Sequence, residues 1–61
     1  MEKLNSTEIK ELRERAKMTR QQMATDLGVT RMAIYLWEMG RSRPSMLACR
    51  QLRRLERRIG K

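Results

Sequence analysis

Residues 19–39 read TRQQMATDLGVTRMAIYLWEM and are the most informative part of the sequence. Thr19 and Gln22 have the spacing of an N-terminal capping box, and Gly28 can end a helix by taking a positive φ. Thr30 has a side chain suited to the N-cap of a second short helix. The pattern predicts two helices joined by a tight turn. Their apolar residues converge on one corner: Met23, Leu27, Val29, Ile34 and Trp37.

Two small residues distinguish this pair of helices from a generic helical hairpin. Ala24 leaves room for the second helix to approach the first, and Gly28 permits a left-handed turn. Together with the converging apolar residues, these are the requirements of a helix-turn-helix over residues 19–39. A generic helical hairpin is the alternative, but it needs neither small residue at these positions.

Helical signals also flank this unit. Asn5-Ser6-Thr7 offers N-caps, and apolar residues follow at i, i+3 and i+7: Ile9, Leu12 and Ala16. After Gly40, a basic loop leads into a long helix predicted over residues 45–59. Its apolar positions are Leu47, Ala48, Leu52, Leu55 and Ile59. No segment alternates like a strand. We expect an all-α fold, a small bundle of four helices with frayed ends at residues 1–4 and 60–61.

Length and composition restrict the possible functions. We expect residues 1–61 to form one domain. The chain has no His and one Cys, Cys49, so we expect no disulfide framework, no cysteine-built zinc site, no cofactor and no catalytic constellation. It has no apolar run approaching the roughly 20 residues of a membrane span, and we expect no hydrophobic leader. We therefore expect a cytoplasmic protein that has no membrane contact, is not an enzyme and has no small-molecule substrate.

The charge of the chain is unevenly distributed. The net charge is +8, and residues 31–61 hold nine basic and two acidic side chains. Such a balance favours a polyanionic partner. We expect the polyanion-facing surface to come mostly from this second half. A solvated basic helix kept for solubility is the alternative.

Four stretches carry a resemblance to a known family: IKELRERAKMT (9–19), MATDLGVTR (23–31), WEMGR (37–41) and RPS (43–45). Over residues 9–45 the chain resembles the phage-repressor/Cro-like (XRE-type) helix-turn-helix DNA-binding family. The resemblance implies a lambda-repressor-like fold and a DNA-binding function. It also implies that Arg13 and Glu38 form a buried ion pair, with two unrelated surface charges as the alternative.

The last helix departs from that family. Its members usually carry a fourth and a fifth helix, but no Gly or Pro lies between Ser45 and Ile59, which favours one long helix. Three of its apolar residues are candidates for contact with a second copy in a homodimer: Leu52, Leu55 and Ile59. The alternative is that they complete the chain's own core.

The helix that begins at Thr30 would lie in the major groove. By resemblance, the base-contacting positions are Thr30, Arg31, Met32 and Leu36, and Tyr35 lies on the same face. Arg31 is the strongest candidate, since arginine pairs with guanine O6 and N7. Met32 and Leu36 suit a thymine methyl group or a protein partner. The candidate phosphate contacts are Thr19, Arg20, Arg41 and Arg43.

These observations predict a regulator that binds double-stranded DNA sequence-specifically. We expect a dimeric repressor or autoregulator that occupies its operator on the bacterial or phage nucleoid. One alternative is an antitoxin-like module that binds protein through Met32, Leu36 and Met39. The other is a non-specific nucleic-acid-binding protein, although the scarcity of aromatic residues argues against readout of single strands.

Overall fold

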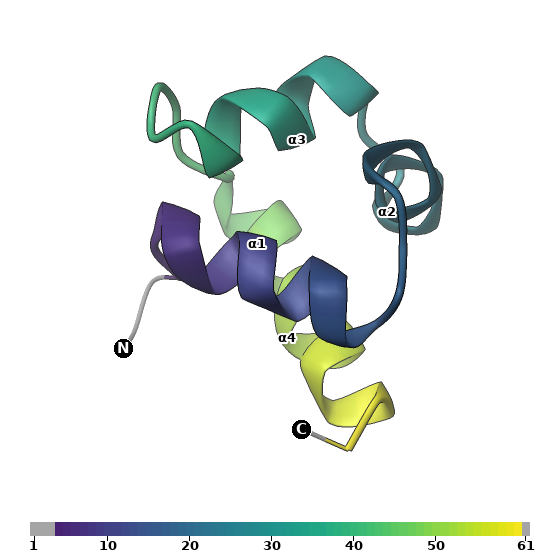
Figure 1. Cartoon of the computed structure of the whole chain (residues 1–61). Helices are drawn as coiled ribbons and strands as arrows, with labels where there is room; N and C mark the ends of the chain where they lie inside the picture. The colour runs from purple at the N-terminus through teal and green to yellow at the C-terminus, as the bar shows by residue number, and fades with distance from the viewer. Residues whose placement is uncertain (1–3, 61) are drawn as a thin grey trace.

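The structure, a computed structural model, describes residues 4–60. Over that range the chain forms four helices and no strand: α1 (Ser6–Arg15), α2 (Arg20–Leu27), α3 (Arg31–Glu38) and α4 (Met46–Arg58). Figure 1 shows α1 across the middle of the molecule, α3 above it, α2 beside them, and α4 behind α1 and descending to the C-terminal end. The predicted all-α bundle with one long last helix is confirmed.

Each helix begins at a side chain whose oxygen accepts a hydrogen bond from the backbone N–H three residues later. These N-caps are Asn5, Thr19, Thr30 and Ser45. At α2 the predicted capping box is complete: Thr19 Oγ1 accepts from the Gln22 N–H at 3.1 Å, and Gln22 Oε1 accepts from the Thr19 N–H at 2.9 Å. Replacing such a cap by Ala costs about 1 kcal/mol, so these side chains fix where the helices start.

Glycines end α2 and α3. Gly28 and Gly40 both have a φ of +76°, a conformation that other residues adopt at a cost. At the end of α2, the Gly28 N–H donates to the Thr25 carbonyl and the Val29 N–H to the Ala24 carbonyl, the two bonds of a Schellman motif. The predicted left-handed turn between α2 and α3 is therefore present.

All four helices contribute to the core. The largest fully buried side chains are Ile9 of α1, Met23 of α2, Ile34 of α3, and Leu52 and Leu55 of α4. Burying one such side chain stabilises the fold by roughly 1.5–3 kcal/mol. The complete buried set is Leu4, Ile9, Leu12, Met23, Ala24, Leu27, Ile34, Trp37, Ala48, Leu52 and Leu55.

Two sequence expectations about the core are wrong. Leu47, expected among the apolar positions of the last helix, is 65% exposed, because the buried stripe of α4 runs through Ala48, Leu52 and Leu55. Leu4, expected in a frayed end, is buried. It directly precedes the Asn5 N-cap, and Ile9 is the fourth residue of α1, so the pair has the spacing of a hydrophobic staple.

Candidate nucleic-acid interface

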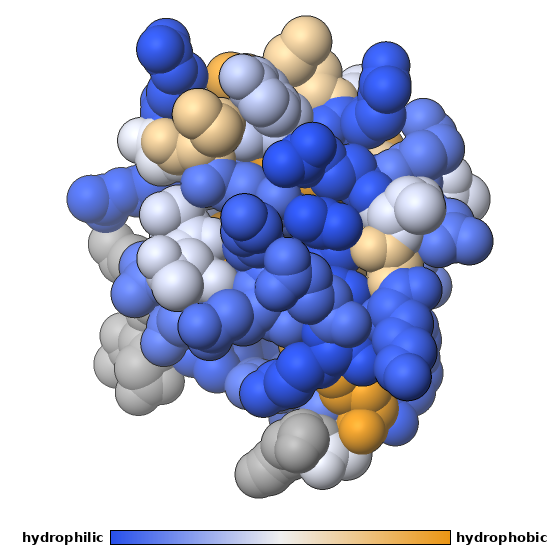
Figure 2. Space-filling model, viewed as in Figure 1, coloured by the Kyte–Doolittle hydropathy of each residue, from blue (hydrophilic) through white to orange (hydrophobic). Residues whose placement is uncertain are grey.

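The exposed side of α3 carries most of the residues expected to read bases. Thr30, Arg31, Met32 and Tyr35 are all exposed, whereas Leu36 is half-buried and presents less of its side chain than expected. The Thr30 hydroxyl accepts from the Ala33 N–H at 3.0 Å, which holds the start of the helix. In Figure 2 the face in view is mostly hydrophilic, and apolar residues gather at its upper edge over α3.

The turn before α3 sets how this face is presented. Ala24 is fully buried, and Val29 is half-buried and packs against the core. The α2–α3 pair is the most closely packed pair of helices in the described chain, and Ile34 and Trp37 fix α3 from beneath. As a result, Arg31 stands at the N-terminal end of a helix that is anchored on its opposite side.

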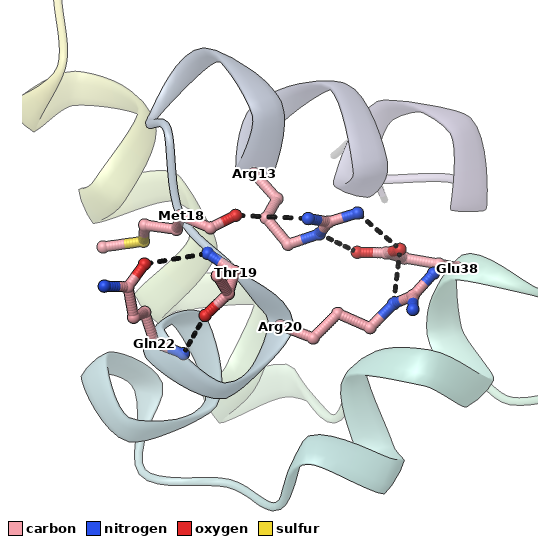
Figure 3. Close-up of polar contacts among 6 residues, drawn as sticks. All are labelled: Arg13, Met18, Thr19, Arg20, Gln22 and Glu38. Carbon is pink, nitrogen blue, oxygen red and sulfur yellow. Dashed lines mark hydrogen bonds and ion pairs between the residues drawn. The ribbon is translucent and has the colours of Figure 1, made fainter.

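A buried carboxylate ties three helices together (Figure 3). Glu38, at the end of α3, is only 2% exposed in its side chain, and its Oε2 accepts from Arg13 Nε of α1 at 2.6 Å. Its Oε1 accepts from Arg13 Nη2 at 3.2 Å and from Arg20 Nε of α2 at 3.1 Å. The third Arg13 nitrogen, Nη1, donates to the Met18 carbonyl at 3.1 Å. The expected Arg13–Glu38 pair is thus present, with Arg20 as an additional partner.

The hydrogen bond to Glu38 raises the pKa of the Arg13 guanidinium above its ordinary value. Burial opposes this shift, and the negative charges of Glu38 and Glu14 add to it. Because the folded-state pKa is the higher one, this stabilisation is present below the ordinary pKa of arginine and is lost only as the pH rises through the raised value. Arg13 therefore stays charged at neutral pH.

Arg20 has two intramolecular contacts that the sequence reasoning missed. Besides its bond to Glu38, its Cζ lies 5.5 Å from the centre of the Tyr35 ring, a cation–π distance. Arg20, a candidate for contact with DNA phosphates, is therefore held against the exposed face of α3, and its side chain is 39% exposed. The spacing of Arg20 and Glu38 contained no signal for this contact, because it depends on how α2 crosses α3.

The other candidate phosphate contacts flank α3. Thr19 is exposed at the start of α2, where its hydroxyl and its backbone N–H both belong to the capping box. Arg41 and Arg43 are exposed in the loop after α3. The Arg41 N–H donates to the Leu36 carbonyl at 2.9 Å, so Gly40 fixes where the Arg41 backbone leaves the helix. The structure thus places these residues at the two edges of the α2–α3 unit.

The arginines of α4 lie elsewhere. Arg54, Arg57 and Arg58 belong to the second half of α4, and Figure 1 shows that this end of the molecule is the one farthest from α3. Arg58 Nη2 pairs with Asp26 Oδ2 at 3.1 Å. The positive charge of residues 31–61 is therefore divided between the α3 side of the molecule and the second half of α4. That the polyanion-facing surface comes mostly from residues 31–61 stays a prediction.

The candidate dimer residues are mostly covered by the chain itself. Leu52 and Leu55 are 0% and 1% exposed, and Ile59 is half-buried. The first two complete the chain's own core, which was the alternative interpretation, because α4 turns its apolar stripe toward that core and packs against α2. They offer no surface to a second copy.

Residues 4–60 hold no group of three or more His, Cys, Asp or Glu side chains that could bind a metal ion. None of the described helices combines the length and apolar character of a membrane span.

A protein-family model described as helix-turn-helix matches residues 9–55, more than half of the chain. The matched range takes in α1, the α2–α3 pair and most of α4, so it covers the ion-pair network and the exposed face of α3. No curated protein and no solved structure matches the chain significantly.

Proposed function

This chain belongs to the XRE-type helix-turn-helix family of DNA-binding transcription regulators, and we propose that it is a repressor or autoregulator that reads a specific double-stranded sequence. It acts by occupying its operator, as a dimer on an inverted repeat. Residues 1–61 work as one DNA-binding unit in the cytoplasm, on nucleoid DNA, and the protein functions by binding rather than by catalysis.

The observation that carries this proposal is the setting of Arg31. Its side chain is exposed at the first turn of α3, and among residues 4–60 it has no ion pair or hydrogen-bond partner. A helix anchored by Ile34 and Trp37 presents it. A free guanidinium on a rigid helix suits a bidentate contact to guanine O6 and N7, worth roughly 1–3 kcal/mol of discrimination.

The residues around Arg31 suit the rest of a groove contact. Met32 is 62% exposed and is placed to touch a thymine methyl group, and Tyr35 presents its hydroxyl on the same side. Arg41 and Arg43 bind phosphates beyond the end of α3, and Thr19 and the Nη groups of Arg20 bind them beside α2. Such contacts fix the register on the duplex without reading sequence.

Selection from a random pool of duplex DNA, at about 0.15 M salt, tests this function. We expect enrichment of an inverted repeat whose half-sites lie about one helical turn, 34–36 Å, apart. The Arg31→Ala variant should then lose preference at one base pair per half-site while still binding DNA. If no sequence is enriched and the binding is lost as the salt concentration rises, the protein is a non-specific polyanion binder instead.

A second candidate function is an antitoxin-like interaction with another protein. The exposure of Met32 at 62% and Met39 at 53% favours it, because both are apolar and lie on or just beyond α3. The two functions differ in what covers these side chains. If bound duplex DNA protects Met32 and Met39 from oxidation, the regulator is supported. If the protein does not bind DNA, the protein-binding function is favoured.

A further inference from the structure

We propose that a row of arginines on α4 binds the phosphate backbone of a second segment of duplex DNA while α3 occupies the operator. The arginine row consists of Arg50, Arg54 and Arg57. The inference rests on the proposed function, because the segment is the second one only when an operator is already bound at α3. The protein would then join two DNA segments through two different surfaces.

The arginine row follows from the helical spacing of α4. Its members are separated by four and three residues, the spacing at which side chains share one face of a helix. Because each residue advances about 100° around the helix axis, Arg54 lies about 160° away from the fully buried Leu52. All three arginines are exposed. The row therefore points away from the core.

The positive charge of the row is not neutralised within the chain. Among residues 4–60, no side chain of the row has a hydrogen bond or an ion pair. The one acidic residue of α4, Glu56, pairs with Arg53 at 3.1 Å. Arg50 and Arg54 lie four residues apart, a spacing at which like charges destabilise a helix. A bound anion would remove this repulsion.

Stabilisation of the end of α4 does not account for the row. Cations in the last turn of a helix are favourable because they face the negative end of the helix dipole. This reason applies to Arg57 and to Arg58. Arg50 and Arg54 are the fifth and ninth of the 13 residues of α4, so they lie before the last turn.

An open hollow of about 420 Å³ lies beside the row, toward α2. Arg54 and Arg57 line it, together with Gln51, Arg58 and Asp26. Arg58 Nη2 pairs with Asp26 Oδ2 at 3.1 Å, so these two side chains hold each other at one edge. The Gln51 amide can donate a hydrogen bond to a phosphate oxygen. Two unpaired guanidinium groups and a neutral donor thus border one space.

The length of the row suits a phosphate backbone. Arg50 and Arg57 are seven residues apart, which is about 10 Å along the helix axis. One DNA strand carries a phosphate for about every 3.4 Å of duplex axis, so about three successive phosphates lie along that length. Arginine binds phosphate oxygens through paired N–H groups, and such contacts require no particular base. We therefore expect the row to bind duplex DNA without sequence preference.

Other polyanionic partners fit the row less well. The row and the residues lining the hollow include no aromatic side chain on which the bases of a single strand could stack. The row also includes no apolar residue of the kind that anchors a protein interface. The apolar stripe of α4 is buried, so the helix cannot insert it into a membrane surface. A duplex backbone requires none of these features.

The row and α3 lie on different sides of the molecule. Figure 1 shows α3 at the top and the second half of α4, which carries Arg54 and Arg57, at the opposite end. Both helices turn their exposed sides away from the shared core. A straight duplex on α3 therefore leaves the row free to meet another segment. Such segments have a high local concentration around a protein bound to a chromosome.

Blocking α3 isolates the second contact for measurement. The protein is first saturated with a short unlabelled duplex that carries only the enriched operator sequence. Specific sites bind roughly 10³–10⁷-fold more tightly than other sequences, so α3 stays occupied. A fluorescent duplex without the operator is then titrated at about 0.05 M salt, and its anisotropy is measured. We expect binding with a slope of about −2.7 in log affinity against log salt, corresponding to three phosphates.

Two variants with the same change in net charge provide the deciding comparison. Arg54→Gln/Arg57→Gln should weaken binding of the second duplex by roughly 30-fold, about fivefold for each exposed charge, and leave the operator affinity unchanged. Lys10→Gln/Lys17→Gln removes two exposed charges from α1 and the turn after it, and should leave both affinities unchanged. Arg54→Lys/Arg57→Lys keeps the charge and should retain most of the binding.

Either of two results would overturn the proposal. The second duplex could bind Arg54→Gln/Arg57→Gln as tightly as the unmodified chain, in which case the row does not contact it. The two glutamine variants could instead lose binding equally, in which case the net charge of the protein attracts the duplex and the row has no special part.

Competition identifies what the row binds. Polyglutamate and vesicles containing phosphatidylserine, at the same concentration of negative charge, should displace the fluorescent duplex less readily than unlabelled duplex does. If either displaces it equally well, the row is a general anion-binding surface, and its assignment to DNA is wrong.

The outcomes separate this inference from the function on which it rests. Enrichment of an operator without binding of a second duplex would preserve the proposed function and reject the arginine row. If no sequence is enriched, the proposed function fails, and the same variants are compared on random duplex. A loss of binding confined to Arg54→Gln/Arg57→Gln would then preserve the phosphate contact of the row, and no loss would reject it.

Discussion

At the scale of single residues, the carboxylate of Glu38 joins α3 to both α1 and α2. It is nearly inaccessible to water and forms ion pairs with Arg13 of α1 and Arg20 of α2. Removing one partner of a buried ion pair usually costs about 3–5 kcal/mol, because the remaining charge stays buried. The Arg13→Met variant keeps most of the apolar part of the side chain. We expect it to lower the free energy of unfolding by about 3 kcal/mol, the lower end of that range, because Arg20 still pairs with the carboxylate.

Urea unfolding followed by circular dichroism measures this cost. The double variant Arg13→Met/Glu38→Gln is the control, because it removes the buried charge together with its partner. It should be less destabilised than the sum of the two single variants. Additive costs would mean that the two side chains do not interact, contrary to their 2.6 Å contact.

Arg20 leads to a separate prediction, since it joins Glu38 to Tyr35. Arg20→Gln removes one hydrogen bond to the carboxylate and the contact with the ring. Because the side chain is partly exposed, we expect a loss of only about 1 kcal/mol of unfolding free energy. Tyrosine fluorescence is masked by Trp37, so the ring is better followed by its proton NMR shifts. Unchanged ring shifts would show that Arg20 and Tyr35 are not in contact in solution.

The Arg13–Glu38 pair was expected only through the family resemblance, and the role of Arg20 was not expected at all. The first contact depends on how α1 packs against α3, and the second depends on how α2 crosses α3. Long side chains such as arginine reach in several directions, so their partners depend on tertiary packing. By contrast, the burial of Ile34 and Trp37 follows from their spacing along one helix, and the sequence predicted it.

At the scale of elements, the starts of the helices were the most predictable feature. Asn5, Thr19, Thr30 and Ser45 act locally, within three residues, so their effect can be inferred from sequence. The end of α1 was not predictable in this way. There Lys17 has a φ of +59°, where α2 and α3 use glycine. The Met18 N–H still donates to the Arg13 carbonyl at 3.1 Å, so the helix closes as if glycine were present.

This strained position carries a stability prediction. A non-glycine residue in the left-handed region destabilises the fold by on the order of 1–3 kcal/mol, and glycine removes that backbone strain. Glycine also makes the unfolded chain more flexible, which lowers the gain by about 0.5–1 kcal/mol. We expect Lys17→Gly to raise the unfolding free energy by about 1 kcal/mol.

The matched control is Gly28→Ala, at a φ of +76° with no atom within 4 Å of an added Cβ. With open space around it, that substitution tests backbone strain alone and should destabilise the fold. Thermal unfolding of both variants would show whether each substitution stabilises or destabilises the fold. Destabilisation by Lys17→Gly would mean that the lysine side chain contributes more than its backbone strain costs.

At the scale of the whole molecule, charge is divided between two regions. Arg31, Arg41 and Arg43 lie on or just after α3, whereas Arg54 and Arg57 lie on the half of α4 that points away from it. Net charge alone did not reveal this division, because it requires knowing the direction in which α4 leaves the loop. A protein with this arrangement should use only part of its positive charge on any one duplex.

Salt dependence measures how many charges a duplex contacts. Each neutralised phosphate contributes about −0.9 to the slope of log affinity against log salt concentration. Arg41→Gln should therefore make the slope shallower by about one phosphate and weaken binding to all sequences alike. Arg54→Gln removes the same charge from the far end of α4, and we expect it to leave the slope unchanged. If the two variants alter the slope equally, the far half of α4 also contacts the duplex, and the division of charge into a DNA-facing and a remote group is wrong. If Arg41→Gln instead shifts preference between sequences at constant slope, Arg41 reads bases rather than phosphates.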